Sequence, residues 1–141
     1  MFDLTEEFHL NNEDESKELA RKIAGNIKAG TVLAFKGDLG AGKSFFCRQI
    51  IKSLCGEDTK VISPTFNLLQ TYETNGFTIY HYDLYRLEHV SEIYELGIED
   101  ALSGNVTLIE WPEIAASLLP QDTIYIQIDI IDDQKRLVSF K

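Results

Sequence analysis

The sequence contains few cysteines and prolines and no long hydrophobic run. Its 141 residues include two cysteines and three prolines. Cys47 and Cys55 form no CxxC pair and have no histidine at metal-ligand spacing, so we interpret both as reduced thiols rather than as a disulfide or a zinc site. Charged or polar residues interrupt the apolar runs within about six positions, whereas a membrane-spanning helix needs about 20 apolar residues. The sequence therefore predicts no membrane helix.

Basic residues are also scarce. The chain has 13 Lys and Arg against 23 Asp and Glu, which gives a net charge of −10. Affinity for long nucleic acids comes mainly from basic side chains that neutralise phosphates, so this charge disfavours direct binding to such a molecule. The first residues lack the basic segment of a secretory signal, which makes a cytoplasmic location the expectation. With 44% hydrophobic residues, residues 1–141 should form a single domain with a real core.

The pattern of apolar residues predicts an α/β protein. Asn12 and Glu15 form a capping pair before a helix that should stop near Gly30, and a second helix should run from the following loop to about Leu54. Asn75-Gly76 predicts a hairpin turn between two strands. Strands are expected at 31–35, 61–62, 66–73, 77–83, 105–110 and 123–131 and in a final stretch through residue 138, with short helices within 89–102 and 114–119.

A glycine-rich segment between the first predicted buried strand and the second predicted helix matches a phosphate-binding motif. Residues 37–44, Gly-Asp-Leu-Gly-Ala-Gly-Lys-Ser, fit the pattern G-x-x-x-x-G-K-[ST]. Glycines let the backbone wrap around an anion, while the helix N-terminus and Lys43 supply positive potential. The Ser44 hydroxyl can bind Mg²⁺. The motif predicts nucleotide binding, but it does not identify the reaction.

Two carboxylates follow predicted strands and are candidates to complete this site. Glu110 comes directly after the apolar run 106–109, and Asp83 follows the run 77–82. Strand alternation places Asp83 on the same face as Ile79 and His81. An acidic residue at a strand end commonly helps a phosphate loop to hold its metal ion. Either residue is equally consistent with a solvated acid at the end of a strand.

Three further residues have two interpretations each. Thr65, in Ser63-Pro64-Thr65, belongs either to a switch-like loop that senses a γ-phosphate or to a proline-stiffened turn. Trp111 is either a packing residue or a nucleotide contact. Arg86 is either a charge-stabilising finger or, as we favour, part of a surface ion pair. The three histidines show no metal-ligand spacing, so we assign none of them to a metal.

Four segments in this order resemble the TsaE (YjeE) family, small bacterial ATPases needed to make threonylcarbamoyladenosine in tRNA. They are residues 37–44, the Ser-Pro-Thr-Phe of 63–66, the His-Tyr-Asp-Leu-Tyr-Arg of 81–86 and the Ile-Glu-Trp-Pro of 109–112. The resemblance extends from about the first helix to the last strand. It implies a P-loop NTPase-like fold of three layers, with a central mixed, mostly parallel sheet and an antiparallel hairpin portion.

The resemblance also implies roles for individual residues. ATP phosphates would lie against the loop residues Asp38, Leu39, Gly40, Ala41, Gly42, Lys43 and Ser44. Ser44 and Glu110 would hold Mg²⁺, Asp83 would lie beside the γ-phosphate, and Thr65 would belong to a switch loop. Positions that match the family less closely, near Glu13 and Lys135, would border the nucleotide together with Trp111. Ser44 stands where members of the family commonly have Thr, and serine keeps the hydroxyl.

The implied function is that of an accessory ATPase. It would support the TsaB–TsaD complex, which transfers the threonylcarbamoyl group to adenosine 37 of tRNAs that decode ANN codons. The chain itself would hydrolyse ATP slowly, would not transfer that group and would meet tRNA only indirectly. One alternative is a nucleotide-gated assembly switch that needs no turnover. Another is a small-molecule P-loop kinase, which normally uses an arginine-rich lid, whereas the four arginines here form no cluster.

Overall fold

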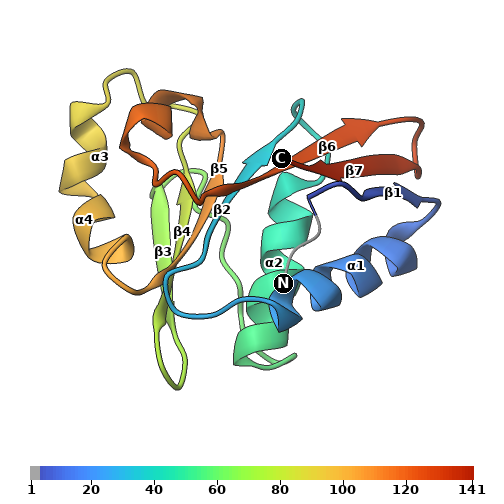
Figure 1. The fold of residues 1–141 in the computed structure, drawn as a ribbon, viewed down its shortest axis with the longest axis horizontal. Coiled ribbons are helices and arrows are strands. Elements are labelled where there is room, and N and C mark those ends of the chain that lie inside the picture. The colour runs from blue at the N-terminus through green and yellow to red at the C-terminus, as the bar shows by residue number, and fades with distance from the viewer. Residues whose placement is uncertain (1–3) are drawn as a thin grey trace.

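The computed structural model describes residues 4–141, which fold around one seven-stranded mixed sheet (Figure 1). The order of strands across the sheet is β1-β7-β6-β2-β5-β4-β3. The strands are β1 (Glu7–Leu10), β2 (Val32–Lys36), β3 (Leu69–Glu73), β4 (Thr78–Asp83), β5 (Val106–Glu110), β6 (Ile124–Ile130) and β7 (Arg136–Phe140). The helices are α1 (Glu13–Gly25), α2 (Lys43–Cys55), α3 (Ser91–Glu95), α4 (Ile98–Ala101) and the 3-10 helix η1 (Pro112–Leu118).

The centre of the sheet is parallel and its edges are antiparallel. Strands β6, β2, β5 and β4 run in one direction, whereas β7 and β1 on one side and β3 on the other pair antiparallel with their neighbours. The predicted mostly parallel core and the predicted hairpin of β3 and β4 are confirmed. Because parallel strands end at the same edge of a sheet, the loops after β2, β4 and β5 lie close together.

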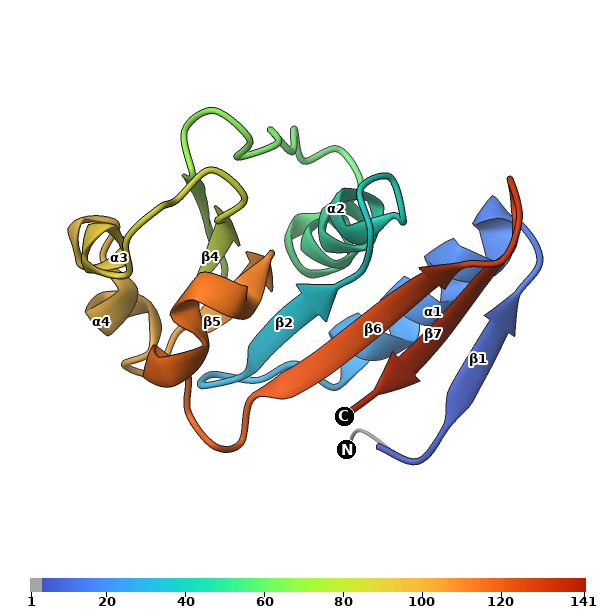
Figure 2. The ribbon, with the colours of Figure 1, turned by 90° about the horizontal axis from the view of Figure 1, so that it is seen from above.

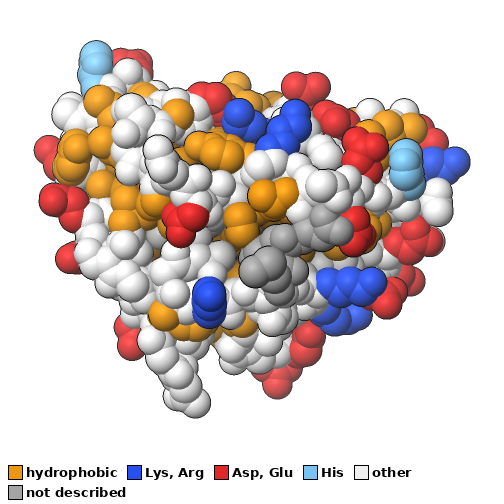
Figure 3. Space-filling model, in the orientation of Figure 1, with side chains coloured by type: hydrophobic (Ala, Val, Ile, Leu, Met, Phe, Trp, Pro, Cys, Tyr) orange, Lys and Arg blue, Asp and Glu red, His pale blue; other side chains and the backbone are white. Residues whose placement is uncertain are grey.

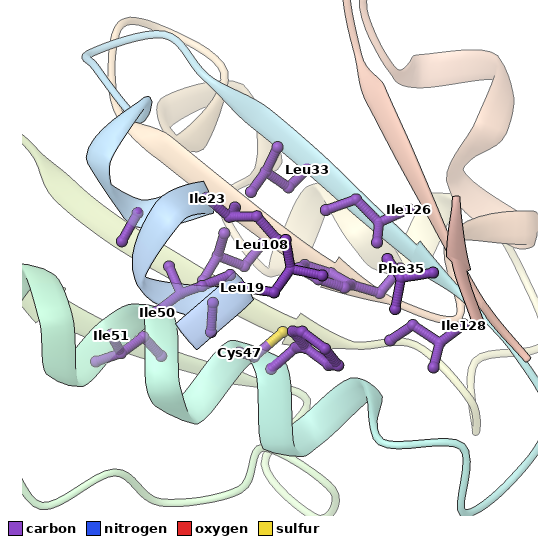
Figure 4. Packing of buried hydrophobic residues seen from close by; sticks show 14 of the residues in the cluster. Leu19, Ile23, Leu33, Phe35, Cys47, Ile50, Ile51, Leu108, Ile126 and Ile128 are labelled. Carbon is purple, nitrogen blue, oxygen red and sulfur yellow. The ribbon is translucent and has the colours of Figure 1, made fainter. Parts of the chain in front are cut away.

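Helices cover both faces of the sheet and create the expected three layers (Figure 2). Helices α1 and α2 pack on one face, where Leu33, Phe35 and Leu108 of the sheet meet Ile50 and other apolar residues of the helices (Figure 4). Helices α3, α4 and η1 pack on the opposite face. No helix among residues 4–141 is long and apolar enough to cross a membrane.

Helix α1 begins as predicted and ends earlier than predicted. The Glu15 backbone N–H donates to the Asn12 side chain at 2.9 Å, so the predicted cap is confirmed. The helix ends at Gly25 rather than near Gly30, because the Asn26 side chain donates to the Lys22 carbonyl and closes the last turn. The start of α1 lies beside the phosphate loop, because Glu13 lines the same hollow as Ala41 and Gly42.

The strand predicted at 61–62 is wrong. The Ile62 N–H donates to the Tyr72 hydroxyl at 3.0 Å instead of to a neighbouring strand. The strand predicted at 66–73 begins only at Leu69, because the Leu68 N–H closes a turn on the Pro64 carbonyl and Leu68 has a φ of 69°. Strand β1 was not predicted at all; it pairs with the edge of β7.

Asn105 fixes the amino ends of three neighbouring segments. Its side-chain oxygen accepts the Thr78 N–H at 3.0 Å, and its backbone carbonyl accepts the Gly30 N–H at 3.0 Å. Its amide nitrogen donates to the Asp100 carbonyl. These bonds align β4 and β5 in the register that sets Asp83 beside Glu110 at the carboxyl edge.

Candidate functional site

The phosphate loop connects β2 to α2 and lies against β6. Gly42 caps the helix with a φ of 115°, and Lys43 is the first helical residue. Gly37 has a φ of 154°, and a Cβ at this position would lie 2.5 Å from the Ile128 carbonyl oxygen of β6. Both the backbone conformation and the close contact therefore require glycine at the first position of the motif.

Lys43 lies at the centre of the loop and is only 5% exposed. Its ammonium group donates to the carbonyls of Gly37 at 2.6 Å and Asp38 at 3.0 Å, and it lies 3.9 Å from the centre of the Trp111 ring. Burial lowers the pKa of Lys43, and nearby carboxylates, Glu110 foremost, partly offset this effect. The loop thus holds a poorly solvated cation ready for an anion.

Glu110 links the end of β5 to the start of α2. The Ser44 hydroxyl donates to Glu110 Oε1 at 2.7 Å. The other carboxylate oxygen, Glu110 Oε2, lies 2.7 Å from His81 Nε2 of β4. Glu110 is 2% exposed, and His81 is 1% exposed. The carboxylate is therefore buried, and each of its oxygens has a hydrogen-bond partner, so it is not a solvated strand-end acid.

Asp83 is the neighbour of Glu110 across the β4–β5 pairing. It is 7% exposed, and its Oδ1 accepts the Tyr85 N–H at 3.1 Å. Burial raises the pKa of Asp83 above its ordinary value, although the Tyr85 bond opposes this shift. The structure brings Asp83, Glu110 and Lys43 to one side of the sheet.

These groups surround a hollow of about 260 Å³ at the carboxyl edge of the sheet, which we term the phosphate hollow. Thr65 lines this hollow, and its hydroxyl lies 2.7 Å from that of Ser63. Arg86 also lines it, over the Phe66 ring at 4.8 Å; within residues 4–141 it forms no ion pair, so our preferred interpretation of Arg86 is wrong. The complete lining is Leu39, Gly40, Gly42, Lys43, Ser44, Thr65, Asp83, Tyr85, Arg86, Glu110 and Trp111.

A second hollow of about 500 Å³ shares Gly42 with the first and is also lined by Ala41. Its walls come from the start of α1, including Glu13, from Phe45 of α2 and from the β6–β7 hairpin. Lys135 does not line it, whereas Arg136 does. The Arg136 Nε donates to the Ala41 carbonyl at 2.9 Å and ties the hairpin to the phosphate loop.

Sequence reasoning missed two of the residues that the structure brings into the site. The alternation of β4 places His81 on the same strand face as Asp83, but the sequence assigns it no role, because it has no metal-ligand spacing. The shared strand face was the available signal. Arg136 had no such signal, because it reaches Ala41 from 95 positions away in the sequence.

Comparisons with known proteins agree on one family. Residues 10–138 match the family profile described as threonylcarbamoyl adenosine biosynthesis protein TsaE. A relative from Rickettsia felis, named tRNA threonylcarbamoyladenosine biosynthesis protein TsaE, is 58% identical over 92% of this chain and 76% of its own length. A Bacillus subtilis protein of the same name is 37% identical over 92% of this chain and 80% of its own.

A solved structure supports the same assignment. The fold is similar to the crystal structure of Bacillus subtilis YdiB, with a TM-score of 0.76 and 29% sequence identity. The match covers 96% of this chain and 83% of YdiB. The chain therefore belongs to the TsaE family, which acts in the biosynthesis of threonylcarbamoyladenosine in tRNA.

Proposed function

We propose that this chain is a Mg²⁺-dependent ATPase that supports threonylcarbamoyladenosine synthesis together with TsaB–TsaD. The observation that carries the proposal is the 2.7 Å bond between the Ser44 hydroxyl and Glu110 beside the buried Lys43 ammonium. A hydroxyl at the helix start and a carboxylate at the end of the adjacent strand are the pair with which P-loop enzymes hold a nucleotide-bound metal. Lys43 supplies the cation for the phosphates.

The donor set suits Mg²⁺. Ser44 and Glu110 offer hard oxygen atoms, which Mg²⁺ prefers, and two protein ligands leave room for water and phosphate oxygens. Bound Mg²⁺ would neutralise charge on the phosphates and orient them. We propose Ser44 and Glu110 as the residues that would hold it.

The other residues have distinct proposed roles. Backbone N–H groups of residues 38–44 bind phosphate oxygens at the start of α2, and Lys43 exchanges its two carbonyl contacts for phosphate. Asp83 and Glu110 are the acidic catalytic residues, and Thr65 positions the γ-phosphate or the attacking water from its loop. Trp111 lines the phosphate hollow and covers the Lys43 ammonium with its ring.

The nucleoside has a separate place. The 500 Å³ hollow adjoins the phosphate loop through Ala41 and Gly42, so a nucleotide can bridge the two hollows across the helix start. We propose that Glu13 and the β6–β7 hairpin border the nucleoside there. Lys135 is close in sequence to this wall, and Arg136 contributes to it directly.

The surface favours a protein partner over direct tRNA binding. Figure 3 shows Asp and Glu side chains around the margins of one face and basic side chains in small separate groups, consistent with the net charge of −10. Beside the phosphate hollow, the apolar side chains of Leu39, Phe66 and Tyr85 are 73%, 78% and 58% exposed. Exposed apolar side chains gathered beside one hollow suit a surface that contacts another protein. We propose that residues 1–141 act as one cytoplasmic domain that docks there on its partner.

Phosphate release from ATP tests this proposal. The purified chain is assayed with Mg²⁺ or with EDTA, alone and with TsaB–TsaD, beside a Lys43→Ala variant. We expect a slow rate that needs Mg²⁺, rises with the partners and is lost in the variant. ATP binding without any phosphate release under all conditions would favour the assembly switch, and a phosphorylated small product in place of free phosphate would favour the kinase.

A further inference from the structure

We propose that His81 is a positioning residue that holds Glu110 in place for the metal ion. The proposal rests on the proposed function, since it concerns the carboxylate assigned there to Mg²⁺. His81 itself lies behind Glu110 and is absent from the lining of the phosphate hollow. It therefore acts through Glu110 rather than on the nucleotide.

The contact between the two side chains is short and dry. His81 Nε2 lies 2.7 Å from Glu110 Oε2, and both side chains are 2% exposed. An ionised carboxylate only accepts hydrogen bonds, so the ring must donate through Nε2–H. With water excluded, no solvent molecule competes for that oxygen.

The other ring nitrogen identifies the tautomer. Within the described residues, His81 Nδ1 is buried and has no hydrogen-bond partner. A proton on Nδ1 would be a buried donor without an acceptor, which costs more than an unused lone pair. The geometry thus favours a ring proton on Nε2, directed at Glu110.

This arrangement divides the two oxygens of Glu110 between two tasks. Oε2 is occupied by His81, and Oε1 faces Ser44 at the start of α2. The carboxylate cannot rotate without breaking the bond to His81. Mg²⁺ would therefore meet a carboxylate whose orientation is already fixed, and less side-chain freedom would be lost when Glu110 held the ion.

A second interpretation makes the cluster itself a metal site. The ligand atoms of Cys47, His81 and Glu110 lie within 4.8 Å of one another. The Cys47 thiol is fully buried, and burial raises its pKa well above the ordinary value, whereas a metal needs the thiolate. His81 Nε2 and both Glu110 oxygens are already bonded. The positioning role therefore accounts better for these contacts.

Two amide variants and one neighbour test the proposal. Gln at position 81 places its amide nitrogen as many bonds from Cβ as Nε2 of histidine, whereas Asn is one bond shorter. His81→Gln and His81→Asn thus match in polarity and differ in reach. Cys47→Ala removes a buried neighbour that makes no bond to Glu110 and controls for lost packing. For each chain, the affinity for a fluorescent ADP is measured with Mg²⁺ and with EDTA.

We expect Mg²⁺ to tighten ADP binding in the wild type, in His81→Gln and in Cys47→Ala. In His81→Asn the increase in ADP affinity caused by Mg²⁺ should fall about tenfold or more, because a metal ligand loses the partner that orients it. The ADP affinity in EDTA should stay the same. Equal gains in both amide variants, or an equal loss in Cys47→Ala, would overturn the proposal. A wild type that binds no ADP would instead contradict the proposed function.

Nitrogen NMR of the wild type provides a test without substitution. The imidazole of His81 should show a protonated Nε2 and an unprotonated Nδ1. The opposite tautomer would contradict the inference even if every variant failed to fold.

Discussion

Ser44 donates a hydrogen bond of 2.7 Å to Glu110, a residue 66 positions further along the chain. The bond joins the start of α2 to the end of β5. Two variants of Ser44 test its importance. Ser44→Thr keeps the hydroxyl and should keep Mg²⁺-dependent ADP binding, whereas Ser44→Ala should weaken that dependence about tenfold. The measurement is ADP affinity against Mg²⁺ concentration, and equal behaviour of the two variants would show that the hydroxyl is not a metal ligand.

Glu110→Ala separates turnover from binding. Removal of the carboxylate should reduce phosphate release by about a hundredfold or more, because Glu110 would no longer hold the Mg²⁺ that neutralises charge in the transition state. ATP should still bind through the loop and Lys43. Phosphate release and tRNA modification by the reconstituted TsaB–TsaD system are measured in parallel. If modification continues without phosphate release, the chain is a switch rather than a working ATPase.

Asp83→Asn should stabilise the free chain and impair phosphate release. Since burial raises the pKa of Asp83 above its ordinary value of 3.8, the folded chain holds this proton more tightly than the unfolded chain. The ionised group therefore lowers the free energy of unfolding above the folded-state pKa, and this cost disappears as the pH falls. Urea unfolding at pH 7 should show a more stable variant, with a smaller difference in acid.

Asp132→Asn is a control in which the expected change in the free energy of unfolding has the opposite sign. Backbone N–H groups of Gln134 and Lys135 lower the pKa of Asp132, so its ionised form stabilises the hairpin. This variant should be less stable than the wild type near neutral pH, and the difference should shrink as the pH falls below 3.8. Equal shifts in both Asn variants would mean that ionisation does not explain them.

Gly37→Ala should destabilise the fold by about 1–3 kcal/mol or displace the phosphate loop, because the new methyl group meets the Ile128 carbonyl. Gly25→Ala is a matched control at the end of α1, where nothing lies within 4 Å of the added carbon. It should be neutral or stabilising by up to about 1 kcal/mol. Chemical denaturation of both variants checks the difference.

Local patterns in the sequence were sufficient for most of the fold. The Asn12 cap, the phosphate loop and the Asn75-Gly76 hairpin each depend on residues within a few positions, and each is present. Strand β1 was missed because its four residues gain their order from β7, at the far end of the chain. The end of α1 was misplaced because Asn26 competes with the more familiar glycine signal at 30.

The candidate site was harder to predict than the fold. Asp83 and Glu110 could be named from strand ends, but their pairing depends on the register of β4 against β5. The contact between His81 and Glu110 depends on that same register, so the sequence indicates the strand face of His81 but not its partner. Arg136 reaches the loop only because the β6–β7 hairpin folds beside it.

The Asn105 side chain lies at the opposite edge of the sheet from the phosphate loop, yet its bonds bear on the arrangement of side chains there. Its bond to the Thr78 N–H sets where β4 begins beside β5. Since side chains alternate along a strand, a slip of one residue would turn His81 and Asp83 away from α2 toward α3 and α4. An amide at the far edge of the sheet therefore helps to determine which side chains of β4 lie beside the phosphate loop.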